Sequence, residues 1–125
     1  MPLKIDLHVH TFYSYDSTIT PKELIIWAKR RGLDAVAVTD HDVFEGASKL
    51  SKNKDFLIIP GIEVSTRYGH VLGIDIRERI PPKLDVTTTI EKIHKAGGIA
   101  IAAHPTAIYR GKLRRQVTAE FDAVE

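Results

Sequence analysis

Cysteine and long apolar runs are both missing from this sequence, and each absence narrows what the protein can be. Without cysteine, disulfide bonds and metal sites built on thiolates are excluded. The longest candidate run, residues 99–103, has the length of a strand and not the roughly 20 residues of a membrane span. The first residues lack the apolar segment of a secretion signal, so we expect a cytoplasmic protein.

A strong charge of one sign is also lacking. The 18 basic and 16 acidic residues leave a net charge of +2, whereas nucleic-acid-binding domains often carry a much stronger basic bias. A hydrophobic fraction of 43% and a charged fraction of 27% are typical of a soluble globular protein. A chain of 125 residues has room for one domain with a single core, so residues 1–125 are taken as that domain.

Apolar runs of strand length alternate with helical patterns, which predicts βα units, a parallel sheet and the α/β class. Strands are predicted at residues 3–9, 35–38, 56–59 with 62–64, 71–74 and 99–103, and a sixth begins at 121–124. Pro60-Gly61 is expected to interrupt the third of them. Helices are predicted from residue 20 to residue 32, at 44–50 and at 87–96, and residues 77–84 are expected to form a loop.

The first helix carries the clearest local signals. Thr20 suits the N-cap, Pro21 suits the first turn, and Glu23 completes a capping box with Thr20. Leu24, Trp27 and Ala28 then fall on one helical face. In the helix at 87–96, Ile90 and Ile93 are expected to point inward.

Five of the six histidines lie at the ends of predicted strands. They are His8 and His10 in the first strand, His41 after the second, His70 before the fourth and His104 after the fifth. Because alternate residues of a strand point the same way, Asp6, His8 and His10 should project together. The sixth histidine, His94, is in the middle of a helix between lysines and is expected on the surface.

The carboxyl ends of parallel strands converge on the edge where sites form in α/β folds, so Asp40-His41, Glu63 and His104 should meet there. A single His-x-His pair is more often two hydrogen-bonded polar residues, and a single Asp-His after a strand is usually a turn. Together, however, these groups need a shared partner, because burying unpaired polar groups costs free energy. A metal cluster supplies such a partner.

The segment Asp6-Leu7-His8-Val9-His10-Thr11, followed by Ser14-Tyr15-Asp16-Ser17, resembles the first motif of the PHP (polymerase and histidinol phosphatase) family. The resemblance continues through residues 33–42, Pro60-Gly61-Ile62-Glu63, His70-Val71-Leu72-Gly73 and residues 97–105. The motifs occur in the family's order, and the small stand-alone phosphoesterases look closer than the polymerase-attached domains. The resemblance implies a distorted, TIM-like (β/α)7 barrel, of which this chain would supply the five to six N-terminal strands.

The same resemblance implies up to three divalent metal ions at the carboxyl rim. His8, His10 and Glu63 would hold the first ion, Glu63 would bridge to a second that His70 and His104 complete, and Asp16 and His41 would hold the third. Asp6 and Asp40 would orient imidazoles. Manganese, zinc and iron all suit these ligands.

The Asp-x-His pair that closes the family's site on a late strand has no match here. The chain therefore resembles roughly the first two-thirds of a PHP domain, the N-terminal portion of a larger barrel. Without that pair, the first and third ions would each lack one ligand.

The implied activity is that of a metal-dependent phosphoric ester hydrolase, with Glu63, His104 and His41 serving catalysis. Ions bridged by Glu63 would lower the pKa of a water molecule, and the resulting hydroxide would attack phosphorus. Arg67 and Arg110 are candidates for binding a substrate phosphate, and a solvated surface position suits both equally well.

Three functions remain open from the sequence. The first is hydrolysis of phosphate esters in nucleotides or short oligonucleotides, and the second is a phosphatase for a small metabolite such as histidinol phosphate. The third is a non-catalytic metal-binding or RNA-associated scaffold, because the archaeal RNA-binding subunit of ribonuclease P has a related barrel. Seven ligand-type residues argue against a scaffold. No membrane partner is expected, nucleic acid is a candidate substrate, and the oligomeric state stays open.

Overall fold

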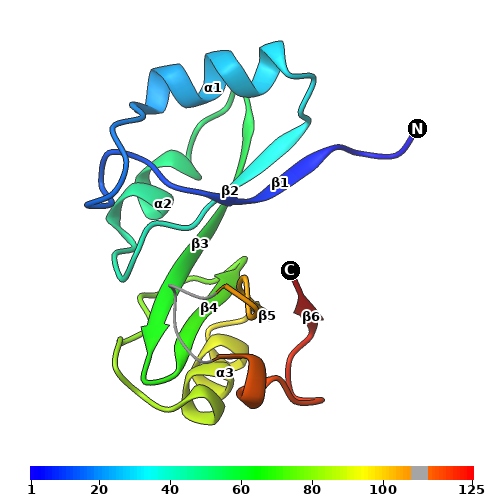
Figure 1. Cartoon of the computed structure of the whole chain (residues 1–125). Helices are drawn as coiled ribbons and strands as arrows, with labels where there is room; N and C mark the ends of the chain where they lie inside the picture. Colours follow the sequence, from blue (N-terminus) through cyan, green and yellow to red (C-terminus); the bar gives the residue numbers. More distant parts are fainter. Residues whose placement is uncertain (108–112) are drawn as a thin grey trace.

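A single curled sheet organises the chain, which is described over residues 1–107 and 113–125 in a computed structural model. Within those residues the strands follow one another in the order β1-β2-β3-β4-β5-β6. They are β1 (Ile5–Val9), β2 (Ala35–Val38), β3 (Leu57–Thr66), β4 (Gly69–Ile74), β5 (Ile99–Ala102) and β6 (Ala123–Val124). The helices are α1 (Pro21–Arg30), α2 (Glu45–Leu50) and α3 (Val86–Lys95), with a 3₁₀ turn at Leu113–Gln116. The sheet forms an open half-barrel (Figure 1), which confirms the predicted α/β class and partial barrel.

The start of α1 follows from its local sequence. The Glu23 amide donates to the Thr20 hydroxyl, and the Glu23 carboxylate accepts a bond of 2.9 Å from the Thr20 amide, so the capping box is confirmed. Leu24 and Ala28 are buried, whereas Trp27 is 55% exposed. The predicted apolar face of α1 is therefore covered only in part.

The sheet is mixed, and the prediction of a parallel sheet is wrong for β4. Strands β1, β2 and β3 are parallel, β4 runs antiparallel to both β3 and β5, and β5 and β6 are parallel. Only Arg67 and Tyr68 lie between β3 and β4. A parallel crossover needs a dozen or more residues, so this connection can only form a hairpin. The hairpin places His70 opposite Ser65, close to Glu63 on the neighbouring strand.

Strand β3 is continuous over ten residues, so the predicted interruption at Pro60-Gly61 is wrong. Pro60 is the last residue paired with β2, and Gly61 is the first paired with β4. A Cβ on Gly61 would lie 2.8 Å from the carbonyl oxygen of Gly73, closer than real Cβ contacts. The dipeptide marks the point at which β3 changes partner, and the strand then carries Glu63 beyond the end of β2.

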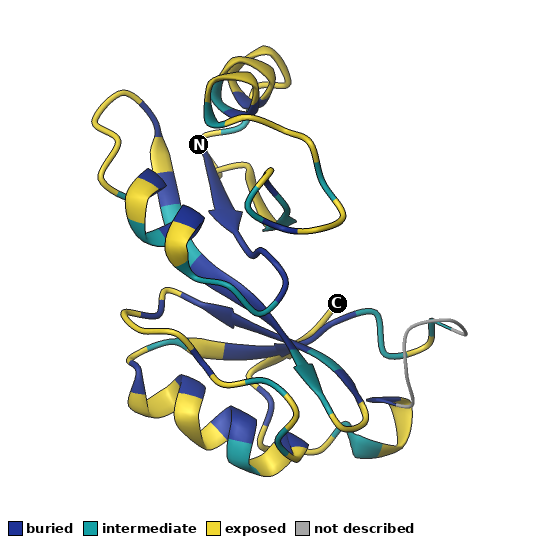
Figure 2. Ribbon diagram, turned by 90° about the vertical axis from the view of Figure 1, so that its left-hand side faces the viewer, coloured by how far each residue is buried: buried dark blue, intermediate teal, exposed yellow. Residues whose placement is uncertain are grey.

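Apolar side chains on the strands and on the inner faces of the helices form the core (Figure 2). One cluster lies between α1, α2 and the parallel strands and includes Val36 and Ile58. Another packs against α3 and includes Ile62, together with Ile90 and Ile93, which point inward as predicted. No helix among the described residues is long and apolar enough to cross a membrane.

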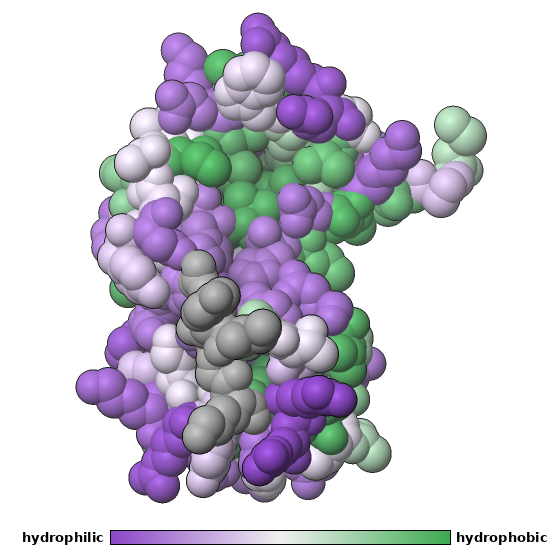
Figure 3. Space-filling model, in the orientation of Figure 1, coloured by the Kyte–Doolittle hydropathy of each residue, from purple (hydrophilic) through white to green (hydrophobic). Residues whose placement is uncertain are grey.

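An apolar groove of about 380 Å³ runs between β1 and α1. Figure 3 shows hydrophobic residues gathered on this face, below α1. The pairing of β1 with β2 shifts by one residue between Asp6 and Val9, and such a bulge breaks the alternation of side chains. Asp6 and Val9 accordingly both line the groove, whereas His8 and His10 line a separate cavity. The prediction that Asp6 projects together with the two histidines is therefore wrong.

Candidate metal centre

Glu63 lies at the centre of the site. Its amide donates to the carbonyl of Asp40 (3.1 Å), and its carbonyl accepts from the amide of Asp42 (3.0 Å). These bonds and an isolated bridge to His41 extend the parallel pairing past the end of β2. Only 1% of Glu63 is exposed, so rigid backbone holds this carboxylate away from solvent.

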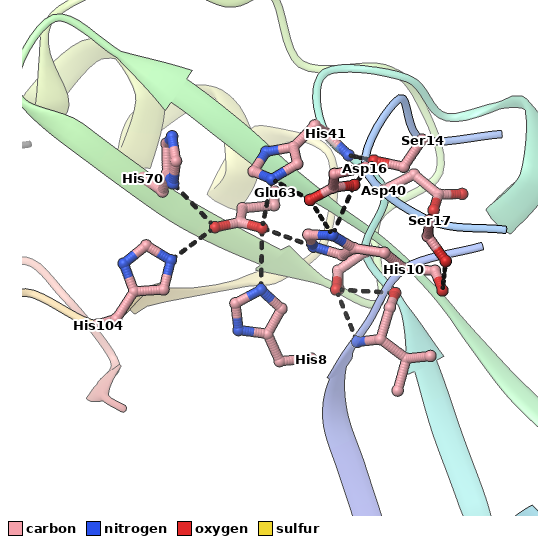
Figure 4. A network of polar contacts seen from close by, with 12 residues as sticks. His8, His10, Ser14, Asp16, Ser17, Asp40, His41, Glu63, His70 and His104 are labelled. Atoms are coloured by element: carbon pink, nitrogen blue, oxygen red, sulfur yellow. Dashed lines mark hydrogen bonds and ion pairs between the residues drawn. The ribbon is translucent and has the colours of Figure 1, made fainter. Parts of the chain in front are cut away.

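Five imidazoles surround the Glu63 carboxylate (Figure 4), and they belong to the five histidines at predicted strand ends. Its Oε2 lies 2.9 Å from Nε2 of His8, 2.6 Å from Nε2 of His10 and 3.5 Å from Nε2 of His41. Its Oε1 lies 3.0 Å from Nδ1 of His70 and 2.9 Å from Nε2 of His104. The two oxygens face different sets of imidazoles, as expected of a carboxylate that can bridge two ions.

Asp16 joins this cluster from the loop after β1. Its Oδ2 lies 3.0 Å from Nδ1 of His10 and 3.1 Å from Nε2 of His41. The buried Ser14 hydroxyl donates to Asp16 Oδ1 (2.7 Å) and accepts from the His41 amide (3.1 Å). Sequence reasoning quoted Ser14 within a motif but gave it no role. A small hydroxyl residue two positions before a predicted ligand was the available signal.

Several ring nitrogens in the cluster are buried and have no hydrogen-bond partner. They are Nε2 of His10, both ring nitrogens of His41 and Nδ1 of His70. The nitrogens of His10 and His70 approach Glu63 to 2.6 and 3.0 Å, but without the geometry of a hydrogen bond. Buried polar atoms without a partner are costly, and imidazole with carboxylate is a donor set that binds transition metals. The residues therefore fit divalent metal ions.

Among the described residues, three groups of donor atoms are close enough to hold an ion, with all atoms of each group within 4.8 Å of one another. They are His8, His10 and Glu63, then His10, Asp16 and His41, and finally His41, Glu63 and His70. The first group contains the ligands predicted for the first ion. The second group adds His10 to Asp16 and His41, the pair predicted for the third ion. The third group contains Glu63 and His70, as predicted for the second ion, but has His41 in place of His104.

The charges in the cluster are coupled. Burial alone would raise the pKa of Glu63, but the close contacts with His10 and two other imidazoles outweigh burial and hold that pKa well below its ordinary value. Burial would lower the pKa of His8, but hydrogen bonds to two acidic neighbours raise it to about 9. For His41 burial prevails and the pKa is lowered. At neutral pH, Glu63 is an anion and His41 is neutral, as metal ligation requires.

A family model described as the PHP domain matches residues 6–110 of the chain. The match spans all seven predicted metal ligands. The chain belongs to the PHP family. This confirms the family resemblance found in the motifs.

Curated relatives of this PHP chain include named hydrolases. An uncharacterized protein of Methanocaldococcus jannaschii is 38% identical over 116 residues, covering 82% of this chain and 68% of that protein. The 5'-3' exoribonuclease of Haemophilus influenzae is 30% identical, covering 74% of this chain and 35% of the enzyme. The phosphoribosyl 1,2-cyclic phosphate 1,2-diphosphodiesterase of Eggerthella lenta is 32% identical, with coverages of 71% and 37%. The class predicted for the chain, metal-dependent phosphoric ester hydrolase, agrees with these relatives, and the chain spans about a third of either named enzyme.

Solved structures show the same PHP fold. A two-domain protein of Bacteroides vulgatus, described as containing a predicted PHP-like metal-dependent phosphoesterase, is 26% identical with a TM-score of 0.65. It is matched over 82% of this chain and 35% of its own. A protein of Bifidobacterium adolescentis has a TM-score of 0.77 at 17% identity, covering 98% of this chain and 77% of its own, which supports the fold alone.

The remaining predicted residues of the PHP site lie outside the cluster or contact it indirectly. The carboxylate of Asp6 accepts from the backbone amide of His8, and the buried carboxylate of Asp40 accepts from the amide and hydroxyl of Thr11. Neither contact is with an imidazole, so both acidic groups hold the backbone of β1 and the loop after it. Sequence reasoning gave Thr11 no role, although it stands directly after His10.

Of the two arginines predicted to bind substrate phosphate, the structure describes Arg67 but not Arg110. Arg67 is at the tip of the β3–β4 hairpin, where its Nε donates to the Lys83 carbonyl (3.4 Å) in the loop before α3. Arg110 lies outside the described residues. His94 is 2.7 Å from Asp122 and exposed, in agreement with its predicted surface position.

We expect metal binding by this PHP cluster to release a proton near neutral pH and to strengthen as pH rises. His8, with its pKa near 9, is protonated at pH 7 and must lose that proton to ligate an ion. Metal affinity should therefore rise by up to about tenfold per pH unit between pH 7 and 9 and level off above that. Calorimetry in two buffers of different ionisation enthalpy measures the protons released.

The free energy of unfolding of the metal-free protein should decrease as pH rises, whereas metal affinity increases. The pKa of His8 is raised above its unfolded value of 6.5, so the stabilisation from protonated His8 is fully present below pH 6.5 and is lost as pH rises through about 9. Denaturant melts of the chelator-treated protein at pH 6.5 and 9 check this.

For the affinity prediction, metal affinity that is independent of pH between pH 7 and 9 would contradict the assignment of His8 as a protonated ligand.

Proposed function

We propose that this chain is a metal-dependent phosphoesterase that hydrolyses phosphate esters of nucleotides or short oligonucleotides. The observation that carries the proposal is the buried Glu63 carboxylate, whose two oxygens face five imidazole nitrogens within 3.5 Å. A structural ion pair needs one partner, whereas this carboxylate has five. Such a set of donors is suited to holding more than one ion beside a substrate.

Divalent ions held by His8, His10, Asp16, His41, Glu63, His70 and His104 would supply Lewis acidity, which activates water and offsets charge on phosphoryl oxygens. The chain itself keeps the donors rigid, because four of them lie on strands or directly beside them. Ser14 holds Asp16 against His41, so the loop after β1 is fixed to the same framework. The cavity beside these residues, about 380 Å³, has room for a phosphate group and part of its ester.

The nucleotide class is supported by two observations. Two of the relatives, at 30% and 32% identity, are named for action on RNA and on a cyclic ribose phosphate. In this chain, the ring of Tyr15 stacks on His41 with centroids 5.2 Å apart, and Tyr15 is 84% exposed. An exposed aromatic ring beside a metal site can stack against a nucleobase, a contact worth about 1–3 kcal/mol.

A hydrolysis panel tests the proposal. It contains dinucleotides, nucleoside monophosphates, ribose 5-phosphate and histidinol phosphate, each with manganese, with zinc and with a chelator. We expect metal-dependent release of phosphate or nucleotide, preferring substrates that contain a base. Preference for histidinol phosphate would favour the small-metabolite phosphatase instead. Protein that binds metal and hydrolyses none of the panel would contradict the proposal.

Replacing Tyr15 by Ala should raise KM for a nucleoside 5'-monophosphate about tenfold and leave KM for ribose 5-phosphate nearly unchanged. These two substrates share the ester and the sugar and differ in the base, so the ratio of their KM values isolates the effect of stacking on the base. Tyr68→Ala, in the β3–β4 hairpin and 43% exposed, is the matched control and should change neither KM. An equal rise in both KM values would show that Tyr15 acts on the phosphate end and not on the base.

A further inference from the structure

Glu125 reaches the cluster from β6, a strand to which neither the motifs nor the sequence pattern assigned a site residue. Its Oε1 lies 2.8 Å from Nδ1 of His8. Its Oε2 accepts a hydrogen bond of 2.9 Å from the backbone amide of His104. One carboxylate thus contacts two predicted ligands from distant strands of the sheet, His8 on the edge strand β1 and His104 after β5.

The segment that carries Glu125 is anchored along its length. Strand β6 pairs with β5, and the Glu125 amide donates to the Ala102 carbonyl (3.0 Å). The Asp122 carboxylate accepts from the Ala100 amide and lies 2.7 Å from Nε2 of His94. These contacts hold the backbone at Glu125 in register with the end of β5, so its side chain approaches the site from a fixed position.

The contact with His8 decides which ring nitrogen faces the site. An ionised carboxylate can only accept hydrogen bonds, so Nδ1 of His8 must carry the proton. Nε2 lies 2.9 Å from the Glu63 carboxylate, so both ring nitrogens donate in the metal-free protein. If an ion takes the place of the Nε2 proton, the contact with Glu125 keeps the other proton on Nδ1. A carboxylate that fixes the tautomer and the orientation of an imidazole typically changes metal affinity by about 10–100-fold.

The second contact fixes the backbone of His104. That residue has φ of 28°, in the left-handed region that residues with a side chain rarely adopt. Surrounding contacts must hold such a conformation, and the His104 amide donates to Glu125. The His104 ring, at 2.9 Å from Oε1 of Glu63, depends on this backbone for its position.

We propose that Glu125 is a positioning residue of the metal centre, which keeps a proton on Nδ1 of His8, leaving Nε2 as the nitrogen for a metal ion, and fixes the backbone that presents His104. This role rests on the proposed metal-dependent function. It makes the β6 strand part of the site, because the two ends of the half-barrel are tied through one side chain.

Glu125→Gln is the most informative variant. An amide offers one acceptor and one donor group, and here it faces two N–H donors, so one contact must be lost or the His8 tautomer must reverse. We expect the variant to bind cobalt or zinc about 10–100-fold more weakly in calorimetry, with a changed cobalt absorption spectrum. Glu120→Gln is the matched control, since Glu120 is exposed in the same segment, and its affinity should stay within about twofold of wild type.

Nitrogen NMR of the wild-type imidazoles in the zinc-loaded protein provides a second readout that does not depend on folding of a variant. It should show His8 with its proton on Nδ1 and zinc on Nε2. A His8 ring protonated on Nε2, or metal affinity of Glu125→Gln equal to wild type, would overturn the proposal. Wild type that binds metal yet hydrolyses no phosphate ester would overturn the proposed function and leave the role of Glu125 in metal binding supported by the affinity difference.

Discussion

Replacing Glu63 by Gln is expected to lower kcat/KM for phosphate ester hydrolysis by at least about a thousandfold. Glutamine keeps the shape of the side chain but removes the charge and turns one oxygen into an N–H donor. Since the two oxygens face separate sets of imidazoles, both sets lose an anionic ligand at once. Loss of metal-supplied stabilisation of the transition state by about 4 kcal/mol corresponds to that factor.

Steady-state assays with manganese or zinc in excess measure the effect. Glu45→Gln is the matched control, because Glu45 is exposed on α2 and pairs with Lys49 one turn away. Its kcat/KM should stay within about twofold of wild type. If Glu63→Gln kept more than a tenth of wild-type activity, Glu63 could not be the bridging ligand, and the catalytic account would fail.

Replacing Gly61 by Ala is expected to lower the free energy of unfolding by about 1–3 kcal/mol. An added Cβ would meet the Gly73 carbonyl oxygen at 2.8 Å and Cγ2 of Thr39 at 2.9 Å. The first of these is backbone of the paired strand β4, so relief requires β3 and β4 to separate. Glu63 is two residues further along β3, and activity should fall together with stability.

Gly73→Ala is the matched control for this packing argument. Its nearest neighbour would be Cγ1 of Ile93 at 3.1 Å, part of a side chain that can move by a few tenths of an ångström. Urea denaturation followed by circular dichroism should show a smaller loss for Gly73→Ala than for Gly61→Ala. Equal losses in the two variants would mean that the approach of backbone to backbone at Gly61 is not the limiting contact.

Much of the site could be predicted from sequence because strand ends are positions that sequence defines well. Four short apolar runs carry the polar residues at or just after their ends to one edge of a sheet, whatever the details of the loops. His8, His10, His41, His104 and Glu63 therefore meet as expected. The capping box of α1 was equally readable, since it depends only on residues three apart.

The direction of the strands was harder to predict from the sequence. An apolar run of four residues does not indicate whether the strand is parallel or antiparallel to its neighbour, so β4 was placed in a parallel sheet. The short interval between the predicted strands at 62–64 and 71–74 was the missed signal. Likewise, Pro60-Gly61 suggested an end to β3, whereas the two residues occupy the place where β3 exchanges β2 for β4.

The contacts that tune the site are tertiary and have no local pattern. The bulge in β1 turns Asp6 into the groove beside α1, and an alternating sequence gives no sign of it. Asp40 is close to Thr11, 29 residues away, and Glu125 is close to His8, 117 residues away. Such pairs form because the curled sheet brings distant segments together, so a local sequence pattern cannot predict them.

Metal content of the purified protein tests the central claim most directly. Wild type, His8→Ala and Glu63→Ala are stripped with chelator, incubated with manganese or zinc, freed of unbound ions and measured by elemental analysis. The account predicts one or more ions per wild-type chain, with most of that metal lost in both variants while their circular dichroism spectra stay unchanged. Wild type that retains no metal, or variants that retain as much as wild type, would contradict a metal centre built on Glu63 and its five imidazoles.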